Sequence, residues 1–303
     1  MGHDHAHGTA TGRHRRRLVI VLAITSTVVV AQVVGGLVSG SLALLADAAH
    51  MLTDASGIAI ALIAASLATR PATSTRTFGL QRAEVLAALA NALLLGVLGV
   101  WVVVEAVQRW NDPPAVETGV MLVVAAVGAL ANLVCLLILR RGQAESLNLR
   151  GAYLEVLGDL VGSVAVIVAG IVIATTGYAR ADVVASVAIG AFILPRAWSL
   201  LRDVLDVLLE ATPKGIELDV VRAHLRDIPS VVDVHDLHAW IITSGVPVLS
   251  AHVVVDDACL AENRSGEVLD ALAACLGEHF DTSHCTFQLE PVGHGDHEAA
   301  GHR

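Results

Sequence analysis

The sequence predicts a polytopic α-helical membrane protein with six transmembrane helices, followed by a small α+β domain. Three observations predict this fold class. The mean hydropathy is +0.68, 55% of the residues are hydrophobic and only 16% are charged, and the apolar residues are concentrated in six blocks. Because soluble domains have about 25% charged residues, this composition excludes an ordinary soluble protein.

Each apolar block has about the length that a helix needs to cross a bilayer, roughly 20 residues for ~30 Å of hydrocarbon. The blocks cover residues 18–38, 42–67, 83–107, 118–139, 152–175 and 183–201. Helices are expected because a bilayer offers no water to backbone N–H and C=O groups. The first block is too long for a signal peptide, and no small-residue cleavage site follows it. We therefore expect a six-helix membrane domain over residues 18–202.

The arginines between the blocks predict the orientation of the chain. They occur in GRHRRR before the first block and in the connections after the second and fourth blocks, at Arg70, Arg76, Arg82, Arg140, Arg141 and Arg150. The alternate connections have little beyond Arg109 and Arg180. Since Lys and Arg are enriched on the cytoplasmic side, we expect both termini in the cytoplasm. The protein should be a lipid-embedded, multi-pass protein of the cell (plasma or inner) membrane.

Residues 203–292 have the periodicities of a separate α+β domain. An amphipathic helix is expected over residues 214–227, directly after Pro213. The stretch VVDVHDLHAWIIT alternates like a strand, SGVP is a turn, and VLSAHVVV is a second strand. Residues 261–280 are typical of another helix and HCTFQLE of a final strand. Helices should therefore cover one face of a small sheet.

Two histidine-rich segments flank these domains: residues 1–17, with MGHDHAHG, and residues 293–303, with GHGDHEAAGHR. Neutral imidazole is a common metal ligand, which favours a modest role in capturing metal from the cytosol. Weak, dispensable chelation in unstructured tails fits the same composition.

Charged and histidine side chains within two of the blocks indicate the chemistry. The second block contains Asp47, His50 and Asp54, and the fifth contains Glu155 and Asp159. A charged residue at mid-bilayer costs roughly 2.5–3.5 kcal/mol on insertion scales, so such residues usually mark an ion pathway or a proton relay. Residues four apart lie on one face of a helix. The pairs His50–Asp54 and Glu155–Asp159 therefore each form an edge with two ligands.

If these two helices face each other, one imidazole and three carboxylates converge. That set suits tetrahedral Zn²⁺ or a similar divalent ion, whose charge neutralises carboxylates that repel one another when the site is empty. Without metal, some of these carboxylates must take up protons, and a site that trades protons for a metal is the core of an antiporter. The alternative is packing by interhelical hydrogen bonds, which two such pairs on different helices disfavour. For Asp47, a cap or solvated position and a place on the ion path stay open.

Four stretches resemble the cation diffusion facilitator family of zinc transporters: LADAAHMLTDASGIAIALIA, TFGLQRAEVLAALANALLL, NLRGAYLEVLGDLVGSVAVIVAG and VHDLHAWIITSGVPVLSAHVVV. They follow the family's order and cover nearly the whole chain. The resemblance implies a homodimer, a ferredoxin-like, metallochaperone-like cytoplasmic domain, and export of Zn²⁺ from the cytoplasm in exchange for protons. It maps the transport site onto His50, Asp54, Glu155 and Asp159.

Glu155 departs from this family, whose zinc-selective members typically have histidine at that position. A carboxylate makes the site harder and more negative, which should relax discrimination against Mn²⁺, Fe²⁺, Co²⁺ and Cd²⁺. Zn²⁺ stays the first choice because His50 remains. Some relatives bind an extra metal in the loop between the second and third helices. Here that loop, RPATSTRTFGLQRAE, has no histidine and no carboxylate before Glu84, so no loop site is expected.

The resemblance also points to a regulatory Zn²⁺ site in the cytoplasmic domain, with His235, His252 and Glu290 as ligands. Because side chains alternate along a strand, a regular strand would put His235 and His238 on opposite faces. They would share an ion only if the strand bends. A metal that bridges two such domains would draw the dimer together and bias the membrane part. The alternative is a set of surface histidines that bind no metal.

Two other classes of function fit part of this pattern. Histidine and carboxylates can hold a catalytic zinc, but the chain has neither H-E-x-x-H nor a nucleophile elbow. Four ligands would also close the coordination shell that a catalytic zinc keeps open. A metal sensor would need an output domain, and the sequence has none visible. We therefore expect a transporter and no enzyme, with divalent metal ions and protons as partners and no nucleic acid.

Overall fold

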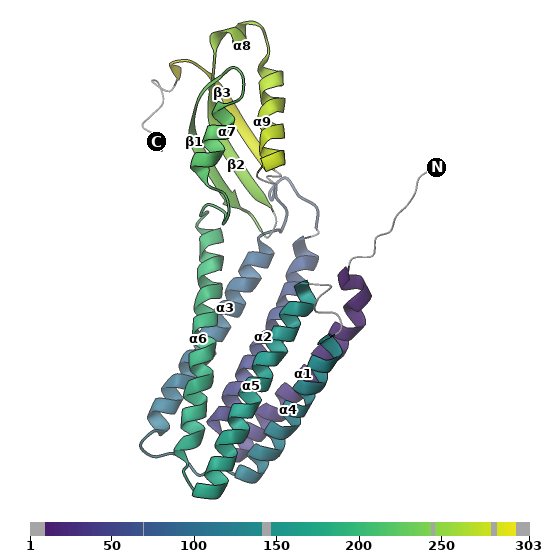
Figure 1. Ribbon diagram of the computed structural model, residues 1–303, viewed down its shortest axis with the longest axis vertical. Coiled ribbons are helices and arrows are strands. Elements are labelled where there is room, and N and C mark those ends of the chain that lie inside the picture. The colour runs from purple at the N-terminus through teal and green to yellow at the C-terminus, as the bar shows by residue number, and fades with distance from the viewer. Residues whose placement is uncertain (1–9, 69, 141–146, 244–245, 280–283, 295–303) are drawn as a thin grey trace, which may run out of the picture. The chain divides into compact units, whose positions relative to one another are not determined.

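The computed structural model describes residues 10–68, 70–140, 147–243, 246–279 and 284–294. They belong to two compact units (Figure 1). The first unit is formed by the chain up to residue 63 together with residues 87–201, and the second by residues 64–86 together with the chain from residue 202 onward. Residues 1–9 of the N-terminal histidine segment and residues 295–303 of the C-terminal one lie outside the described residues, whereas residues 10–17 form the start of the first helix. The role of the two tails in metal capture stays a prediction.

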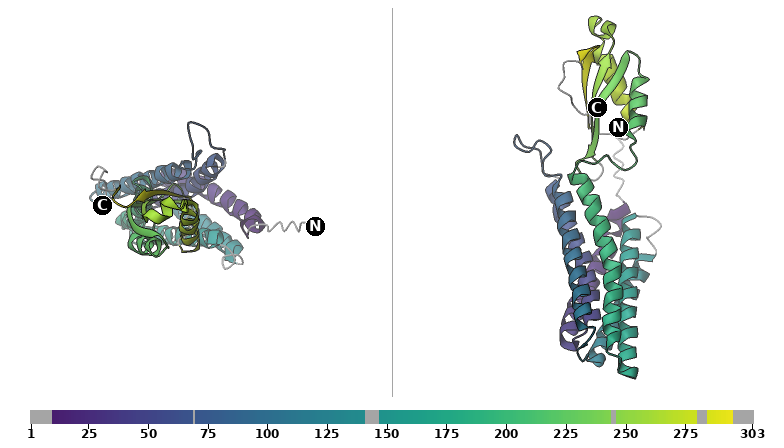
Figure 2. Two further views of the ribbon diagram at one scale, coloured as in Figure 1. Left: turned by 90° about the horizontal axis from the view of Figure 1, so that it is seen from above. Right: turned by 90° about the vertical axis from the view of Figure 1, so that its left-hand side faces the viewer.

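Among the described residues, six long helices form the first unit and run side by side in the views of Figures 1 and 2. They are α1 (Ala10–Ser39), α2 (Leu42–Ala68), α3 (Ala83–Arg109), α4 (Thr118–Arg140), α5 (Leu147–Thr176) and α6 (Arg180–Leu208). The ends of three of these helices, at residues 64–68, 83–86 and 202–208, belong to the second unit. Within the described residues, five of the six helices contain stretches long and apolar enough to cross a membrane: those of α1, α3, α4, α5 and α6. With 27 residues, α2 has the length for a sixth span, about 40 Å at 1.5 Å per residue. The predicted helical membrane domain is confirmed.

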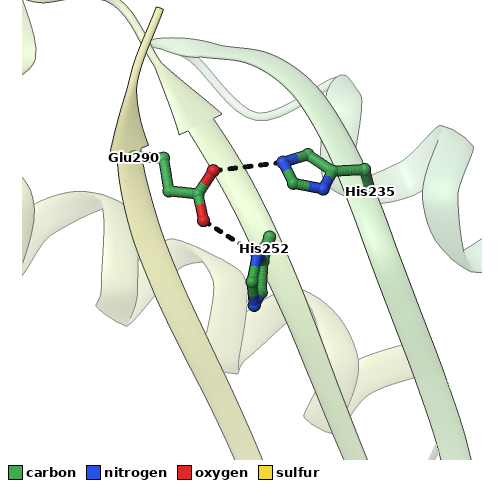
Figure 3. Close-up of side chains that lie close together, drawn as sticks. All are labelled: His235, His252 and Glu290. Carbon is green, nitrogen blue, oxygen red and sulfur yellow. Dashed lines mark hydrogen bonds and ion pairs between the residues drawn. The ribbon is translucent and has the colours of Figure 1, made fainter. Parts of the chain in front are cut away.

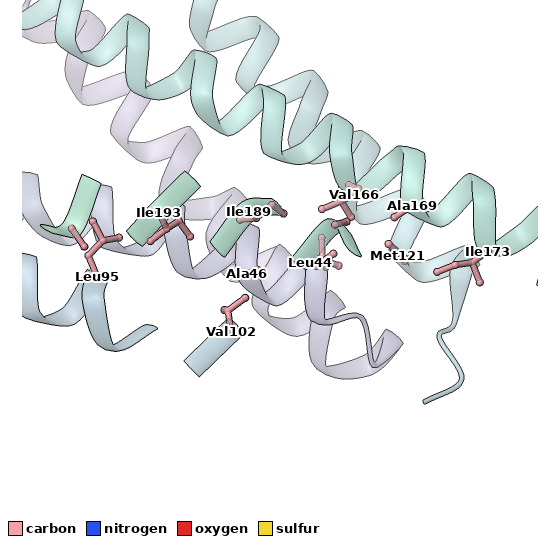
Figure 4. Packing of buried hydrophobic residues seen from close by; sticks show 14 residues of the cluster. Leu44, Ala46, Leu95, Val102, Met121, Val166, Ala169, Ile173, Ile189 and Ile193 are labelled. Carbon is pink, nitrogen blue, oxygen red and sulfur yellow. The ribbon is translucent and has the colours of Figure 1, made fainter. Parts of the chain in front are cut away.

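The helices pack through apolar side chains of five different elements. Figure 4 shows this cluster, to which α2 contributes Leu44, α3 contributes Val102, α4 contributes Met121, α5 contributes Val166 and α6 contributes Ile193. All five are 1% exposed or less. The outer faces of the same helices carry many exposed valines and leucines. Such a surface is unfavourable in water and suits a lipid environment.

The first turn of α2 is held by an aspartate from another helix. Asp182 of α6 is buried and accepts hydrogen bonds from the backbone N–H groups of Leu42, at 2.7 Å, and of Ala43, at 3.2 Å. The Ser41 hydroxyl donates to the same carboxylate at 2.5 Å. The first N–H groups of a helix have no partner within it. Asp182 therefore caps α2 across the bundle and fixes the start of the helix that carries His50.

The second unit contains a three-stranded sheet in the order β1-β2-β3. Its elements are α7 (Leu218–Arg226), β1 (Val231–Ile241), β2 (Pro247–Val255), α8 (Asp257–Ala261), α9 (Ser265–His279) and β3 (His284–Pro291). β1 and β2 are antiparallel, whereas β2 and β3 are parallel. Parallel pairing needs a crossover, which α8 and α9 supply. The predicted α+β arrangement is confirmed, and the short helix α8 is an addition that the sequence analysis did not anticipate.

Both longer helices of this unit cover one face of the sheet. Leu225 of α7 and Leu272 of α9 are fully buried in one cluster with Leu249 and Val253 of β2. Residues two apart on a strand share a face. Ala251 belongs to the same cluster, so the alternate positions Ser250 and His252 lie on the opposite face, away from the helices.

β1 contains a bulge that changes the predicted facing of its two histidines. His235 pairs with His252 and His238 pairs with Ser250, so two residues of β1 oppose one residue of β2 between these pairs. Asp236 within the bulge has a φ of 49°, which is a left-handed conformation. Because positions 250 and 252 share a face, so do His235 and His238. The regular alternation was wrong here, and the bulge is its physical reason.

Candidate metal centres

Three potential ligands meet inside the helical unit, on α2 and α5. One ligand atom each of His50, Asp54 and Asp159 lies within 4.8 Å of the other two. Nε2 of His50 is 3.9 Å from Oδ2 of Asp54 and 3.9 Å from Oδ1 of Asp159. His50 and Asp159 are 4% and 2% exposed. The expected approach of the second and fifth transmembrane helices is therefore present at the level of these side chains.

The size and chemistry of this group fit a divalent cation. A tetrahedral Zn²⁺ with bonds of about 2.0–2.1 Å holds neighbouring ligand atoms about 3.3–3.4 Å apart. The two distances of 3.9 Å from Nε2 of His50 therefore need to shorten by about half an ångström. Among the described residues, neither ring nitrogen of His50 has a hydrogen-bond partner, and Oδ1 of Asp159 has none. Buried polar atoms without a partner are costly. A cation placed between them would satisfy them.

Glu155 lies beside this group without joining it. Its Oε1 accepts a hydrogen bond from Nη2 of Arg196 at 3.1 Å, and the side chain is 36% exposed. Nη1 of the same guanidinium donates to Oδ2 of Asp54 at 3.3 Å. The four predicted side chains are therefore neighbours, but only three converge, while Arg196 holds the fourth.

Arg196 was not among the site residues predicted from the sequence, because that prediction rested on the acids and histidines within the apolar blocks. A signal was present, because Arg196 lies inside the sixth block, at 183–201. An arginine at such a position is costly unless it finds a partner. Two of the predicted metal ligands are its partners here.

A second buried polar cluster surrounds Asp47, about one turn from His50. Oδ2 of Asp47 accepts hydrogen bonds from Nε2 of Gln32 at 2.6 Å and from the Ser163 hydroxyl at 3.0 Å. Asp47 is fully buried. A solvated or capping position is thereby excluded, since Asp182 is the residue that caps α2. Asp47 instead joins α1, α2 and α5 through hydrogen bonds.

The cytoplasmic candidates come together across all three strands of the sheet. Figure 3 shows His235 of β1, His252 of β2 and Glu290 of β3 with their polar ends facing one another. Nε2 of His235 is 3.1 Å from Oε2 of Glu290, and Nδ1 of His252 is 2.8 Å from Oε1. The two imidazole rings have centroids 5.2 Å apart. Glu290 is 1% exposed.

The strand register explains this second group. His235 and His252 are directly paired in β1 and β2, and Glu290 pairs with Val254 in the parallel ladder, one step along the same face. His238 lies on that face but is engaged with Asp236, with Nε2 3.1 Å from its Oδ1. The structure thus assembles the three predicted residues and leaves His238 outside the group.

Comparisons with known proteins agree with this architecture. Residues 18–209 match the family description of a cation efflux transmembrane domain, and residues 213–292 match that of the cytoplasmic domain of a cation efflux protein. The metal cation efflux system protein CzcD of Cupriavidus metallidurans is 46% identical over 99% of this chain and 93% of its own.

Two further similarities concern the whole chain and the cytoplasmic domain. A cadmium, cobalt and zinc/H⁺-K⁺ antiporter of Bacillus subtilis is 36% identical over 99% of this chain and 95% of its own. A solved structure of the metal-bound C-terminal domain of the C. metallidurans CzcD transporter shares 40% identity, with 25% of this chain and 99% of that chain covered and a TM-score of 0.23. The chain therefore belongs to the cation diffusion facilitator family of membrane transporters, which export metal cations and are not enzymes.

Proposed function

We propose that the protein exports Zn²⁺ from the cytoplasm in exchange for protons, with His50, Asp54 and Asp159 as transport ligands and Glu155 as a fourth. The single observation that carries this proposal is the convergence of three buried ligand atoms from α2 and α5 within 4.8 Å. An uncompensated buried carboxylate is costly. The site must therefore exchange its cation for something, and protons are the simplest substitute.

The choice of Zn²⁺ is supported by the imidazole of His50 and by the metals in the name of the B. subtilis relative, which include zinc and also cadmium and cobalt. A site of three carboxylates and one imidazole is harder than one with two imidazoles. Export of a broader set of divalent cations is therefore the second candidate, and Glu155 is the residue that favours it.

The cytoplasmic group His235–His252–Glu290 is proposed as a regulatory Zn²⁺ site on the open face of the sheet. Two histidines and a carboxylate whose oxygens lie 3.1 Å and 2.8 Å from their ring nitrogens match the donor set that zinc takes in proteins. We propose that the protein works as a homodimer with both termini in the cytoplasm. Metal on this face would then strengthen the contact between two cytoplasmic domains.

Everted membrane vesicles loaded with a zinc-sensitive dye test the exporter directly. Zinc uptake is expected to depend on an inwardly acidic pH gradient and to be lost in Asp159→Asn, while Asp112→Asn in an exposed loop keeps the wild-type rate. Uptake in wild-type vesicles that ignores the gradient would overturn proton exchange. Normal uptake in Asp159→Asn would overturn the site.

A further inference from the structure

We propose that Arg196 is a tethered counter-cation of the transport site, which pairs with Asp54 and Glu155 in the metal-free protein and is displaced by the incoming metal ion. The inference rests on the proposed function of His50, Asp54 and Asp159. It adds a residue that regulates binding and release at that site without being a metal ligand.

The first support is that the guanidinium and the metal site share a single atom. Oδ2 of Asp54 is the oxygen that faces Nε2 of His50, at 3.9 Å. The same Oδ2 accepts from Nη1 of Arg196 at 3.3 Å. A metal bound between His50 and Asp54 would take over the lone pairs that Arg196 now uses. Metal and guanidinium therefore compete for this atom.

The second support is the fork of Arg196, which bridges the two helices of the site. One nitrogen binds Asp54 on α2 and the other binds Glu155 on α5. Guanidinium remains protonated at every relevant pH, so it supplies a permanent positive charge to two carboxylates. This pairing explains why Glu155 lies outside the convergent group: its carboxylate is engaged by a cation that the protein itself provides.

Electrostatics determines the consequence for metal binding. A divalent cation between His50, Asp54 and Asp159 would lie close to a like charge on Arg196, and in a partly buried site such repulsion is substantial. Displacement of Arg196 removes the repulsion and releases Glu155 to join the ligands. When the metal leaves, the guanidinium pairs again with both carboxylates. Arg196 thus weakens metal binding and favours release, which is useful for a transporter that must not retain its cargo.

The position of Arg196 in the chain allows its side chain to move away from the metal site. It follows Pro195 inside α6, and proline has no N–H with which to continue the helical hydrogen bonds, so a helix bends readily there. The side chain is 40% exposed and has room to leave the site. A guanidinium enclosed in the packed core would have none.

The first test measures zinc affinity and transport in purified, reconstituted protein. All variants carry His235→Ala and His252→Ala and are titrated by competition with a chelating dye, and binding at the membrane site is the part of the zinc binding that His50→Ala with Asp159→Ala removes. Arg196→Gln and Arg196→Met are expected to bind zinc about tenfold more tightly, because one like charge is removed, and to transport it several-fold more slowly at saturation. Arg196→Lys should restore most of the wild-type behaviour, and Arg202→Gln on the same helix should match the wild type. Unchanged or weaker zinc binding in the neutral variants would overturn the proposal.

A second measurement does not depend on the folding of the neutral variants. Lys214 is the only lysine in the sequence, so the amine introduced by Arg196→Lys can be followed by acetylation against this internal reference. Saturating zinc should raise the acetylation rate of the introduced amine several-fold relative to Lys214. If zinc leaves the ratio of the two acetylation rates unchanged, then bound metal does not displace the side chain at position 196, and the proposal is refuted.

The outcomes also separate this inference from the proposed function. If His50→Ala with Asp159→Ala abolishes zinc binding and transport while the Arg196 variants bind like the wild type, only the counter-cation is refuted. If the double variant still binds and transports zinc, the transport site itself is refuted.

Discussion

Nε2 of His50 on α2 lies 3.9 Å from Oδ1 of Asp159 on α5. The spacing of residues in the sequence predicts which side chains share one face of a helix, but it does not predict which two helices are neighbours. This pair is therefore the contact that turns two separate acidic edges into one candidate site. The buried hydrogen bond from Ser163 of α5 to Asp47 of α2, at 3.0 Å, joins the same two helices one turn away.

Replacing Glu155 by histidine should sharpen the preference for Zn²⁺. Imidazole is a softer ligand than carboxylate, and it would no longer attract the guanidinium of Arg196. We expect Cd²⁺, Co²⁺ and Mn²⁺ to compete less well with Zn²⁺ in transport by Glu155→His. The measurement is competition uptake in proteoliposomes, with Glu117→His outside the site as the matched control. Equal competition in both variants would show that position 155 does not set selectivity.

Removing the cytoplasmic histidines should reduce the amount of metal bound without abolishing transport. His235→Ala with His252→Ala leaves Glu290 without its two nearest imidazoles, and the stoichiometry in calorimetry should fall by about one zinc per protomer. His238→Ala is the matched control, because His238 lies on the same face and pairs with Asp236. A stoichiometry that is equal in all three proteins would refute the assignment.

Loss of the Asp182 carboxylate should destabilise the helical unit. Asp182→Ala leaves the buried N–H groups of Leu42 and Ala43 without acceptors, and each unpaired buried group costs about 1–3 kcal/mol. We expect a lower thermal midpoint in detergent, a partial recovery in Asp182→Asn, and no change in Asp203→Ala on the exposed part of α6. A wild-type midpoint in Asp182→Ala would show that the cap contributes nothing.

Asp233 should make the cytoplasmic domain sensitive to acid. Burial alone would raise the pKa of Asp233, but hydrogen bonds from Arg226 and from the Val234 N–H outweigh it and hold this pKa below the ordinary value. The contribution of Asp233 is therefore fully present above the unfolded value of about 3.9 and is lost as the pH falls through the lower folded value. Hydrogen exchange of β1 should be faster in Asp233→Asn than in the wild type above that pH, and the difference should vanish in stronger acid. A difference that persists at the lowest pH would contradict this assignment.

The parts of the fold that follow from local patterns were predictable. Apolar blocks gave the membrane helices, and the strand and helix periodicities gave the α+β domain. The i,i+4 pairs His50–Asp54 and Glu155–Asp159 gave the candidate site. That these four residues transport metal, and that Glu155 joins them when metal is bound, stay predictions.

The parts that depend on tertiary contacts were not predictable. The bulge at Asp236 places His238 on the same face of the sheet as His235 instead of the opposite face. No residue type in VVDVHDLHAW indicates that a bulge forms there. The cap of α2 comes from Asp182, far away in the sequence, and two of the predicted ligands pair with Arg196. Each of these depends on which helix or strand lies next to which, and a single sequence does not contain that information.

The most direct test of the central claim is the number of zinc ions bound per protomer when His235 and His252 are both alanine. We predict that this protein still binds a single zinc ion in its membrane domain. His50→Ala together with Asp159→Ala in the same background should remove that ion. A zinc count that survives the loss of both side chains would contradict a site shared by α2 and α5.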